Sequence, residues 1–501
     1  METFAGIVRR HAQERGTAPA LTFAGRTRSF AELDAATSRL ANVLISRGAR
    51  AGDRVAVLSK NRAEYVDAIL AASKMGATLV GLNWRLSPRE IAEILADADA
   101  ALILADETGA ALLPASPGAP VLRFGAELDA ATAAAEPRDS GHEGMPEEVA
   151  LILYTSGTTG LPKGAMLTNE GMSHTARLAE AWGMGPDAVN LVAMPLFHIG
   201  GCGYGSATMM AGGHTVLMAE VDVPAILRAI PEHRVTHTFL VPAVVQMLLN
   251  APEAAGADLS TLELLMYGAS PMGDVLLRRA MEAFGCRFMH AYGMTETAGT
   301  VVILRPEDHE PDGPRAGLLK SCGRALPWVE LRVVDPATGR DAPAGEVGEI
   351  WLRTRMLMAG YWRNAAATAE AVGEGGWFRT GDAAYLDEEG HVFLFDRYKD
   401  MIISGGENIY PAEIENVLNG HPAVAEVGVI GVPHEKWGER PLAVVVLRAA
   451  AEAGELIAYA RGNLATYKCP DWVRIVDALP RNASGKLLKP ELRRRYGAGA
   501  P

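Results

Sequence analysis

Short apolar runs that alternate with amphipathic helical stretches are the feature that most limits the fold of this chain. Residues 54–58 have the pattern of a strand, residues 64–75 that of a helix, and residues 78–81 that of a further strand. This order is the unit from which sheets with covering helices are built. We therefore predict an α/β fold whose large N-terminal lobe, with several subdomains, is made of βαβ sheets.

The chain of 501 residues is longer than one hydrophobic core usually grows, so two or three domains are expected. Residues 108–146 are rich in Ala, Gly and Pro and are interpreted as a variable loop region before a strand at 149–154. Residues 345–351 suggest the edge of a hairpin, and the pattern changes again near Asp396. We predict an AMP-binding N-terminal domain at 1–395, a hinge at 396–399 and a small, mobile α+β lobe at 400–501. That lobe includes a helix at 411–418 and a strand at 424–430.

Charge and cysteine content exclude several classes of protein. A net charge of −13 argues against a nucleic-acid partner, which needs clustered Lys and Arg, and gives no attraction to an anionic membrane. The N-terminus has no apolar leader, and no apolar run is long enough to cross a bilayer. The four cysteines are far apart without CxxC spacing, which indicates reduced thiols. We predict a cytoplasmic protein without integral membrane association.

A loop rich in glycine and hydroxyl side chains follows the strand at 149–154. Its sequence is Tyr154-Thr-Ser-Gly-Thr-Thr-Gly-Leu-Pro-Lys-Gly164. Glycine backbone N–H groups, hydroxyl groups and one lysine are what a phosphate cradle requires. The loop is not a Walker A motif, because Gly164 follows Lys163 where that motif has Ser or Thr. The candidate phosphate-binding residues are Thr155, Ser156, Gly157, Thr158, Thr159 and Lys163.

Together with further motifs in a fixed order, this loop resembles the adenylate-forming superfamily. The superfamily comprises acyl-CoA synthetases, adenylation domains of peptide synthetases and beetle luciferase. The other motifs are 195–199 (Pro-Leu-Phe-His-Ile), 267–270 (Tyr-Gly-Ala-Ser), 292–296 (Tyr-Gly-Met-Thr-Glu), 378–382 (Phe-Arg-Thr-Gly-Asp), 396–400 (Asp-Arg-Tyr-Lys-Asp), 405–408 (Gly-Gly-Glu-Asn) and 480–486 (Pro-Arg-Asn-Ala-Ser-Gly-Lys). The resemblance extends over nearly the whole chain.

The resemblance implies a nucleotide site. Thr295 and Glu296 occupy positions that contact the α-phosphate and ligate magnesium in the family, and a carboxylate with phosphate oxygens suits that hard ion. Asp382 is implied to accept both ribose hydroxyls. The implied adenine slot consists of Gly268, Ala269, Ser270, His290, Ala291, Tyr292 and Gly293, with His290 where relatives often carry an amide.

The resemblance also implies a switch between two half-reactions. Arg397 and Lys399 lie in the implied hinge. Lys486 would bridge the substrate carboxylate and the ATP phosphate during adenylation. After the small lobe rotates, Gly405 and Gly406 would leave a narrow path for the pantetheine arm of coenzyme A.

The residues of the expected acid pocket are mostly apolar. His198 matches a family position that gates the acyl tunnel, and the glycines within 200–205 favour an open tunnel. The second wall, residues 236–245, has no Arg or Lys for a second carboxylate. His237 in this wall is interpreted as either a packed core residue or a donor to a polar acyl tail.

These features predict an ATP-dependent acid:CoA ligase that uses ATP, Mg²⁺ and coenzyme A. The expected acid is an apolar medium- or long-chain fatty acid or an aryl acid, which would place the enzyme in fatty-acid or other lipid metabolism. Two alternatives are an acyl-AMP ligase that delivers to a carrier protein and an inactive nucleotide-binding regulator. A monomer and a homodimer are both open.

Overall fold

The computed structural model describes residues 2–155, 162–254, 256–270, 272–397, 400–404, 407–434, 436–481 and 487–497. Contacts within the chain divide it into two compact units. Unit 1 contains residues 1–269, 280–306 and 354–373, and unit 2 contains residues 270–279, 307–353 and 374–501.

The first sheet of unit 1 has the strand order β6-β5-β3-β4-β7-β8. Its neighbouring strands are parallel except for the antiparallel pair β7–β8. Every residue of β4 is buried, as expected of a central strand covered on both faces. The strands are β3 (Arg54–Leu58), β4 (Thr78–Leu82), β5 (Leu102–Ala105), β6 (Val121–Arg123), β7 (Val149–Thr155) and β8 (Lys163–Thr168).

The second sheet of unit 1 runs in the order β14-β13-β12-β11-β9-β10-β1-β2. Its strands from β13 to β1 are parallel to their neighbours, whereas β14 and β2 are antiparallel. The strands are β1 (Pro19–Phe23), β2 (Arg26–Ser29), β9 (Val189–Val192), β10 (His214–Leu217), β11 (His237–Leu240), β12 (Leu264–Gly268), β13 (Arg287–Met294) and β14 (Gly299–Leu304).

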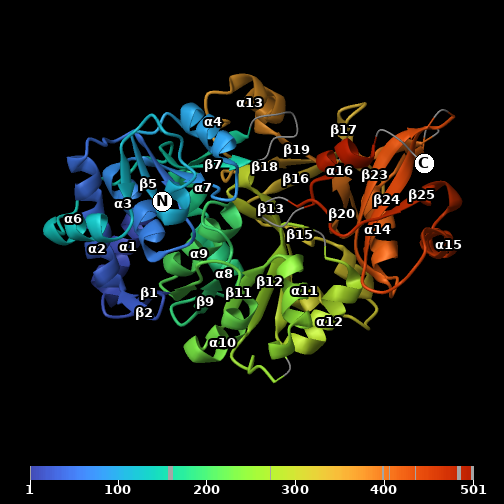
Figure 1. Ribbon diagram of the computed structural model, residues 1–501, viewed down its shortest axis with the longest axis horizontal. Helices are drawn as coiled ribbons and strands as arrows, with labels where there is room; N and C mark the ends of the chain where they lie inside the picture. The colour runs from blue at the N-terminus through green and yellow to red at the C-terminus, as the bar shows by residue number, and fades with distance from the viewer. Residues whose placement is uncertain are drawn as a thin grey trace. The chain divides into compact units, whose positions relative to one another are not determined.

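Helices of unit 1 begin where local sequence can satisfy their free N–H groups. Ser29 with Glu32 and Ser87 with Glu90 form capping boxes at the starts of α2 and α4. In Figure 1, α1, α2 and α3 lie together beside the sheets. The helices are α1 (Phe4–Arg15), α2 (Phe30–Ser46), α3 (Ala63–Met75), α4 (Pro88–Ala98), α5 (Glu107–Ala110), α6 (Ala126–Ala134), α7 (Asn169–Ser173), α8 (Thr175–Ala181), α9 (Ile199–Met210), α10 (Val223–His233), α11 (Pro242–Asn250) and α13 (Ala365–Ala371). One further helix, α12 (Asp274–Phe284), has residues in both units.

Unit 2 contains two sheets. One has the order β17-β16-β18-β19-β20, and the other has the order β22-β21-β24-β23 with β25 paired to β24. The apolar sides of α14 and α15 pack on the second sheet around Ile414, Leu456 and Val445. The strands are β16 (Glu330–Asp335), β17 (Arg340–Asp341), β18 (Gly348–Arg353), β19 (Phe378–Leu386), β20 (Val392–Arg397), β21 (Ile402–Ser404), β22 (Glu407–Ile409), β23 (Val424–His434), β24 (Gly438–Leu447) and β25 (Trp472–Ile475). The helices are α14 (Pro411–Asn419), α15 (Ala453–Asn463) and α16 (Lys489–Tyr496).

The predicted fold class is confirmed, since parallel sheets with helices dominate the large N-terminal part and the C-terminal part is a small α+β lobe. One local expectation was wrong. Residues 108–146 are not only loop, because β6 extends the first sheet beside β5 and α6 packs on α2. The boundaries at 395 and 400 stay a prediction, and Tyr398 and Lys399 of the predicted hinge lie outside the described residues.

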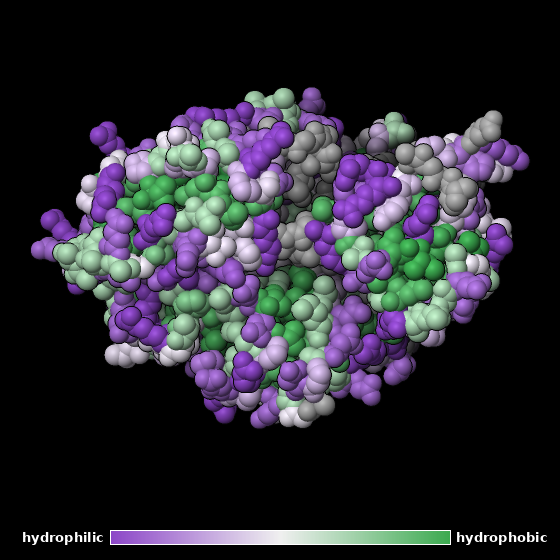
Figure 2. Space-filling model, in the orientation of Figure 1, coloured by the Kyte–Doolittle hydropathy of each residue, from purple (hydrophilic) through white to green (hydrophobic). Residues whose placement is uncertain are grey.

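Hydrophilic residues cover much of the face of the molecule that Figure 2 shows. Within the described ranges, no helix is long and apolar enough to cross a membrane.

Candidate active site

The predicted phosphate loop joins the two strands of a hairpin. Thr155 at the end of β7 pairs with Lys163 at the start of β8. The antiparallel pairing therefore holds the two ends of the loop together, whereas a Walker A loop leads from a strand into a helix. Ser156, Gly157, Thr158 and Thr159 lie outside the described residues.

A carboxylate from the second sheet lies beside this hairpin. Glu296 is part of a short 3-10 helix, Thr295–Thr297, directly after β13. Its Oε1 accepts a hydrogen bond from the Tyr361 hydroxyl at 2.9 Å and one from Thr155 Oγ1 at 3.4 Å. Lys163 Nζ lies 5.2 Å from the centre of the Tyr361 ring. The structure thus brings together three predicted residues, Thr155, Lys163 and Glu296, and adds Tyr361.

Backbone hydrogen bonds fix the segment that carries Tyr361. Its flanking residues pair with β8, through Trp362 N to Gly164 O at 2.8 Å and Ala359 N to Met166 O at 2.9 Å. Met358 N also donates to the carbonyl oxygen of Glu296 at 2.8 Å. The segment 358–362 therefore connects β8 to the turn that holds the carboxylate. Sequence reasoning missed Tyr361, because nothing in the local pattern at 360–362 marks it as functional.

The ends of β12 and β13 approach each other at the predicted adenine slot. A methyl group added to Gly268 would lie 2.1 Å from the carbonyl oxygen of Ala291, so only glycine fits there. Ala269 has a φ of +65°, a left-handed conformation that costs energy for a residue with a side chain. The His290 ring stacks on Tyr267, with centres 4.9 Å apart.

The remaining predicted residues of this part lie close in sequence to these strand ends. Tyr292 and Thr295 are buried. Gly293 lies against β14, because an added methyl group would be 2.0 Å from the Gly299 carbonyl oxygen.

His198 caps the first turn of α9. Its Nδ1 accepts a hydrogen bond from Gly200 N at 3.1 Å. In the neutral ring the proton therefore lies on Nε2, which can act as a donor. The Phe239 ring lies between this turn and the end of β12, since methyl groups added to Gly200 and Gly268 would be 3.4 and 3.5 Å from it.

Phe239 is the first of three aromatic rings that form a row. Phe239 packs on Tyr204 at 5.4 Å between centres, and Tyr204 packs on Trp182 at 5.2 Å. Gly201 does not leave open space, because an added methyl group would lie 2.1 Å from the Pro195 carbonyl oxygen. The close contact explains the glycine at 201 by packing, and the open tunnel expected at 200–205 stays a prediction.

His237 is buried near the same row. Its Nδ1 lies 2.7 Å from Thr236 Oγ1, and burial lowers the pKa of the ring. A neutral, buried imidazole agrees with the interpretation of His237 as a packed core residue.

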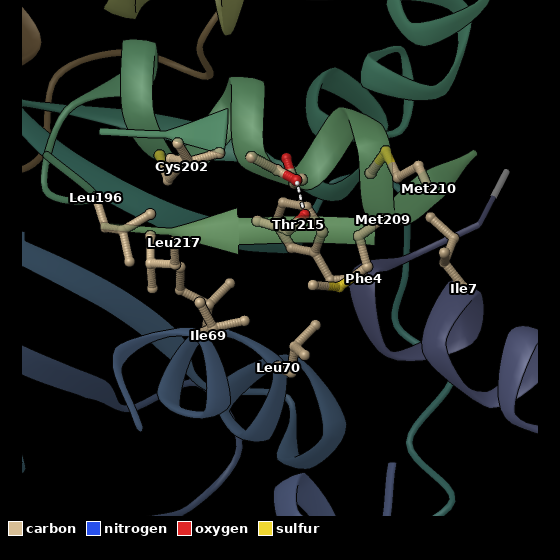
Figure 3. Close-up of a pocket in the computed structure, with 14 residues that line it drawn as sticks. Phe4, Ile7, Ile69, Leu70, Leu196, Cys202, Met209, Met210, Thr215 and Leu217 are labelled. Atoms are coloured by element: carbon tan, nitrogen blue, oxygen red, sulfur yellow. Dashed lines mark hydrogen bonds between the residues drawn. The ribbon is translucent and has the colours of Figure 1, made fainter. Parts of the chain in front are cut away.

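An apolar cavity lies beside α9 (Figure 3). Its wall includes Phe4 of α1, Ile69 of α3 and Met209 of α9. Thr215 Oγ1, which also lines it, donates to the carbonyl oxygen of Gly205 at 3.5 Å. Burial raises the pKa of the Cys202 thiol in this wall to about 12, so the thiol is protonated at neutral pH.

Unit 2 carries the other predicted nucleotide residues. Asp382 on β19 stands opposite Arg397 on β20 in the antiparallel register. The Asp382 backbone N–H donates to Thr380 Oγ1 at 3.0 Å, and Gly381 before it has a φ of +71°. Ser270 also belongs to unit 2. The predicted residues Lys399, Gly405, Gly406 and Lys486 lie outside the described residues.

The chemistry of the site suits magnesium held together with phosphate oxygens. Mg²⁺ commonly binds through one or two carboxylates, and the substrate phosphates supply further ligands. Both hydrogen bonds to Glu296 use Oε1, and no described residue binds Oε2. Nowhere in the described part of the chain do three His, Cys, Asp or Glu side chains form a metal cluster of their own. Glu296 thus fits a metal that arrives with a nucleotide.

Comparisons with known proteins agree with this geometry. Residues 8–362 match the AMP-binding enzyme family, and residues 413–486 match the AMP-binding enzyme C-terminal domain. A feruloyl-CoA synthase of Amycolatopsis sp is 40% identical, with 97% of this chain and 98% of the relative covered. A fatty acid–acyl-carrier-protein ligase of Streptomyces coeruleorubidus is 38% identical, with 97% and 95% covered. Among solved structures, ATP-bound MatB from Rhodopseudomonas palustris superposes with a TM-score of 0.91 at 33% identity, with 99% of each chain covered.

The fold and the site define an adenylate-forming enzyme of the ligase class, as the motifs predicted. The chain belongs to the AMP-binding enzyme family.

Proposed function

We propose that the protein is an ATP-dependent acid:CoA ligase. A carboxylate oxygen of the acid attacks the α-phosphorus of ATP, and pyrophosphate leaves with the electrons of the broken P–O bond. The thiol of coenzyme A, on losing its proton, then attacks the carbonyl carbon of the acyl-AMP, and AMP leaves. The observation that carries this proposal is the cluster of Thr155, Lys163 and Glu296 at the phosphate-loop hairpin.

The adenylation step brings two anions together, which is unfavourable by roughly 4 kcal/mol per charge pair at 4 Å and an effective dielectric near 20. Lys163 and the loop hydroxyls are proposed to bind the phosphates. Glu296 is proposed to hold Mg²⁺, which when bound neutralises charge on the phosphate oxygens. Lys486 is proposed to bridge the two reacting groups.

The other nucleotide contacts are proposed from the motif positions. The strand ends at 268–270 and 290–293 would hold adenine. Asp382 would accept the ribose hydroxyls, and Arg397 and Lys399 would act at the hinge. Gly405 and Gly406 would border the path of coenzyme A.

The acid is proposed to be apolar, with an aryl acid favoured over a long straight chain. The support is the Phe239 ring between Gly200 and Gly268, followed by the rings of Tyr204 and Trp182. Aromatic side chains pack well on a flat ring and fill the space that a long chain would need. A relative at 40% identity is named a feruloyl-CoA synthase, which agrees with a ring-shaped acid.

A second candidate function is transfer to a carrier protein. It is supported by the relative named a fatty acid–acyl-carrier-protein ligase, at 38% identity over nearly the full chain. We favour CoA because Gly405-Gly406 and the sequence Trp437-Gly-Glu439 resemble those of CoA ligases.

The decisive experiment measures AMP and pyrophosphate release with cinnamates, benzoates and fatty acids of graded length, each with and without coenzyme A. Steady turnover that requires coenzyme A and is fastest with an aryl acid is the expected result. A single burst of pyrophosphate without turnover would favour a carrier protein. No release with any acid would contradict the ligase proposal and favour an inactive nucleotide-binding regulator.

A further inference from the structure

We propose that Tyr361 is a positioning residue that orients the Glu296 carboxylate for magnesium and links it to Lys163. The inference rests on the proposed function, because it assumes that Glu296 holds the metal of Mg–ATP. Tyr361 lies outside every motif that the sequence singled out.

The first argument is the hydrogen bond to the carboxylate. A carboxylate can rotate about its last bond, and a free one would spend little time in the orientation that a metal requires. The Tyr361 hydroxyl, 2.9 Å from Oε1, and Thr155 Oγ1, 3.4 Å from the same atom, restrict this rotation. Both donors use one oxygen, so the residues that the structure describes leave the lone pairs of Oε2 for a metal ion. A hydrogen bond to an ionised group is stronger than one between neutral groups, and Tyr361 as a whole residue is only 9% exposed.

The second argument is the ring of Tyr361. Lys163 Nζ lies 5.2 Å from its centre, within the range of a cation–π interaction. One side chain therefore contacts both charged groups that the proposed mechanism assigns to the phosphates, with its hydroxyl on the carboxylate and its ring beneath the ammonium group.

The third argument is the rigidity of the support. Residues on both sides of Tyr361 are bound to β8, and Met358 N binds the Glu296 carbonyl oxygen. Tyr361 itself forms an isolated antiparallel bridge with Ala165. The hydroxyl is thus placed by a backbone frame that includes both the hairpin of the phosphate loop and the turn of Glu296, as precise positioning requires.

The test compares ATP binding in excess Mg²⁺ with ATP binding in EDTA, by calorimetry and without any acid, so that no chemistry occurs. Tyr361→Phe keeps the ring over which Lys163 lies and removes only the hydroxyl. We expect the preference for Mg–ATP over metal-free ATP to fall about 5- to 10-fold, while the affinity for metal-free ATP stays within twofold of wild type. Tyr459→Phe, far from these residues in the sequence and in unit 2, should match wild type in both buffers.

Glu296→Gln and the double variant, Tyr361→Phe with Glu296→Gln, complete a double-mutant cycle. If Tyr361 acts through the carboxylate, Tyr361→Phe has no further effect once Glu296 is replaced. Equal loss in Mg²⁺ and EDTA, or a full additional loss in the double variant, would overturn the proposal in favour of a structural role. Failure of the proposed function looks different, because the wild-type protein itself would then show no preference for Mg–ATP.

Discussion

At the scale of single residues, Arg28 of β2 and Asp67 of α3 form a buried ion pair. Breaking this pair is predicted to lower the free energy of unfolding. Two hydrogen bonds of 2.9 and 2.8 Å join their side chains, and the residues are 9% and 7% exposed. Asp67→Asn leaves a buried guanidinium without its counter-charge and should lower the free energy of unfolding of unit 1 by about 3 kcal/mol. Urea unfolding followed by fluorescence measures this loss.

The paired replacement Arg28→Met with Asp67→Leu is the control. It removes both charges and fills similar volume, so it should recover most of the lost stability. A double variant as unstable as Asp67→Asn would mean that packing, and not the unpaired charge, determines the loss.

His214 at the start of β10 predicts a pH dependence. Burial, and next the charge of His233, lower the pKa of His214 from 6.5 to about 4, and its Nε2 lies 2.7 Å from Thr22 Oγ1. Between these two pKa values the unfolded chain binds a proton that the folded chain does not, so stability falls as the pH falls from about 6.5 to 4. Between pH 7 and pH 5 the loss due to His214 should be about 1 kcal/mol, since partial solvent exposure screens the effect.

Thermal unfolding of wild type and His214→Gln at the two pH values measures this loss. The variant should lose less stability on acidification than wild type. His434→Gln in unit 2 is the control. It should lose as much stability as wild type when the pH is lowered. If the stability of wild type and of His214→Gln changed equally with pH, groups other than His214 would be the cause of the pH dependence.

The proximity of three candidate residues could be predicted from the motifs, because hydroxyl, lysine and carboxylate side chains at motif spacing carry the proposed chemistry. Thr155, Lys163 and Glu296 do meet. Tyr361 could not be predicted. It contacts Glu296 across 65 residues, and that contact depends on a backbone segment lying along β8, which no local pattern encodes.

At the scale of elements, α9 contains glycines of two kinds, and they predict opposite effects. Gly201→Ala would press a methyl group against the Pro195 carbonyl oxygen at 2.1 Å, so it should destabilise unit 1 by about 1–3 kcal/mol. Gly205→Ala, one turn later, meets only Val192 at 3.4 Å, an ordinary contact, and it faces the cavity of Figure 3. It should be neutral or stabilise by up to about 1 kcal/mol, because alanine loses less backbone entropy in a helix.

Thermal denaturation of both variants checks this pair of predictions, and each serves as the control of the other. Equal melting temperatures would contradict the proposed close contact of α9 with Pro195. If only Gly205→Ala lowered the melting temperature, the prediction that Gly201 is closely packed and Gly205 is not would be wrong.

Elements with a clear period were predictable, and those defined by their partners were not. The strand at 54–58 and the helix at 64–75 are β3 and α3 almost to the residue. In contrast, β6 has only Val121–Arg123 and exists because β5 offers it a free edge. The amphipathic pattern of α6 is weak, which is why residues 108–146 resembled a loop.

At the scale of the whole molecule, the two units mix segments that are distant in sequence. Residues 354–373 return to unit 1 after 307–353 have been part of unit 2. Periodicity indicates which face of a segment is buried, but it does not indicate which unit that face packs against. The return of residues 354–373 to unit 1 could therefore not be predicted. It matters for function because the returning segment carries Tyr361.

The last prediction concerns Lys486, which lies in the Gly-Lys motif outside the described residues. If it bridges the carboxylate and the α-phosphate, its charge is needed only while the acid attacks ATP. Lys486→Ala should therefore slow acid-dependent pyrophosphate release by at least about 100-fold, while thioester formation from supplied acyl-adenylate and coenzyme A stays within a few fold. Arg494→Gln is the control, because Arg494 belongs to the same basic tail but is largely exposed and pairs with Glu491. It should leave both half-reactions unchanged. Equal losses in the two half-reactions of Lys486→Ala would mean that the lysine supports the C-terminal lobe in general and has no special part in adenylation.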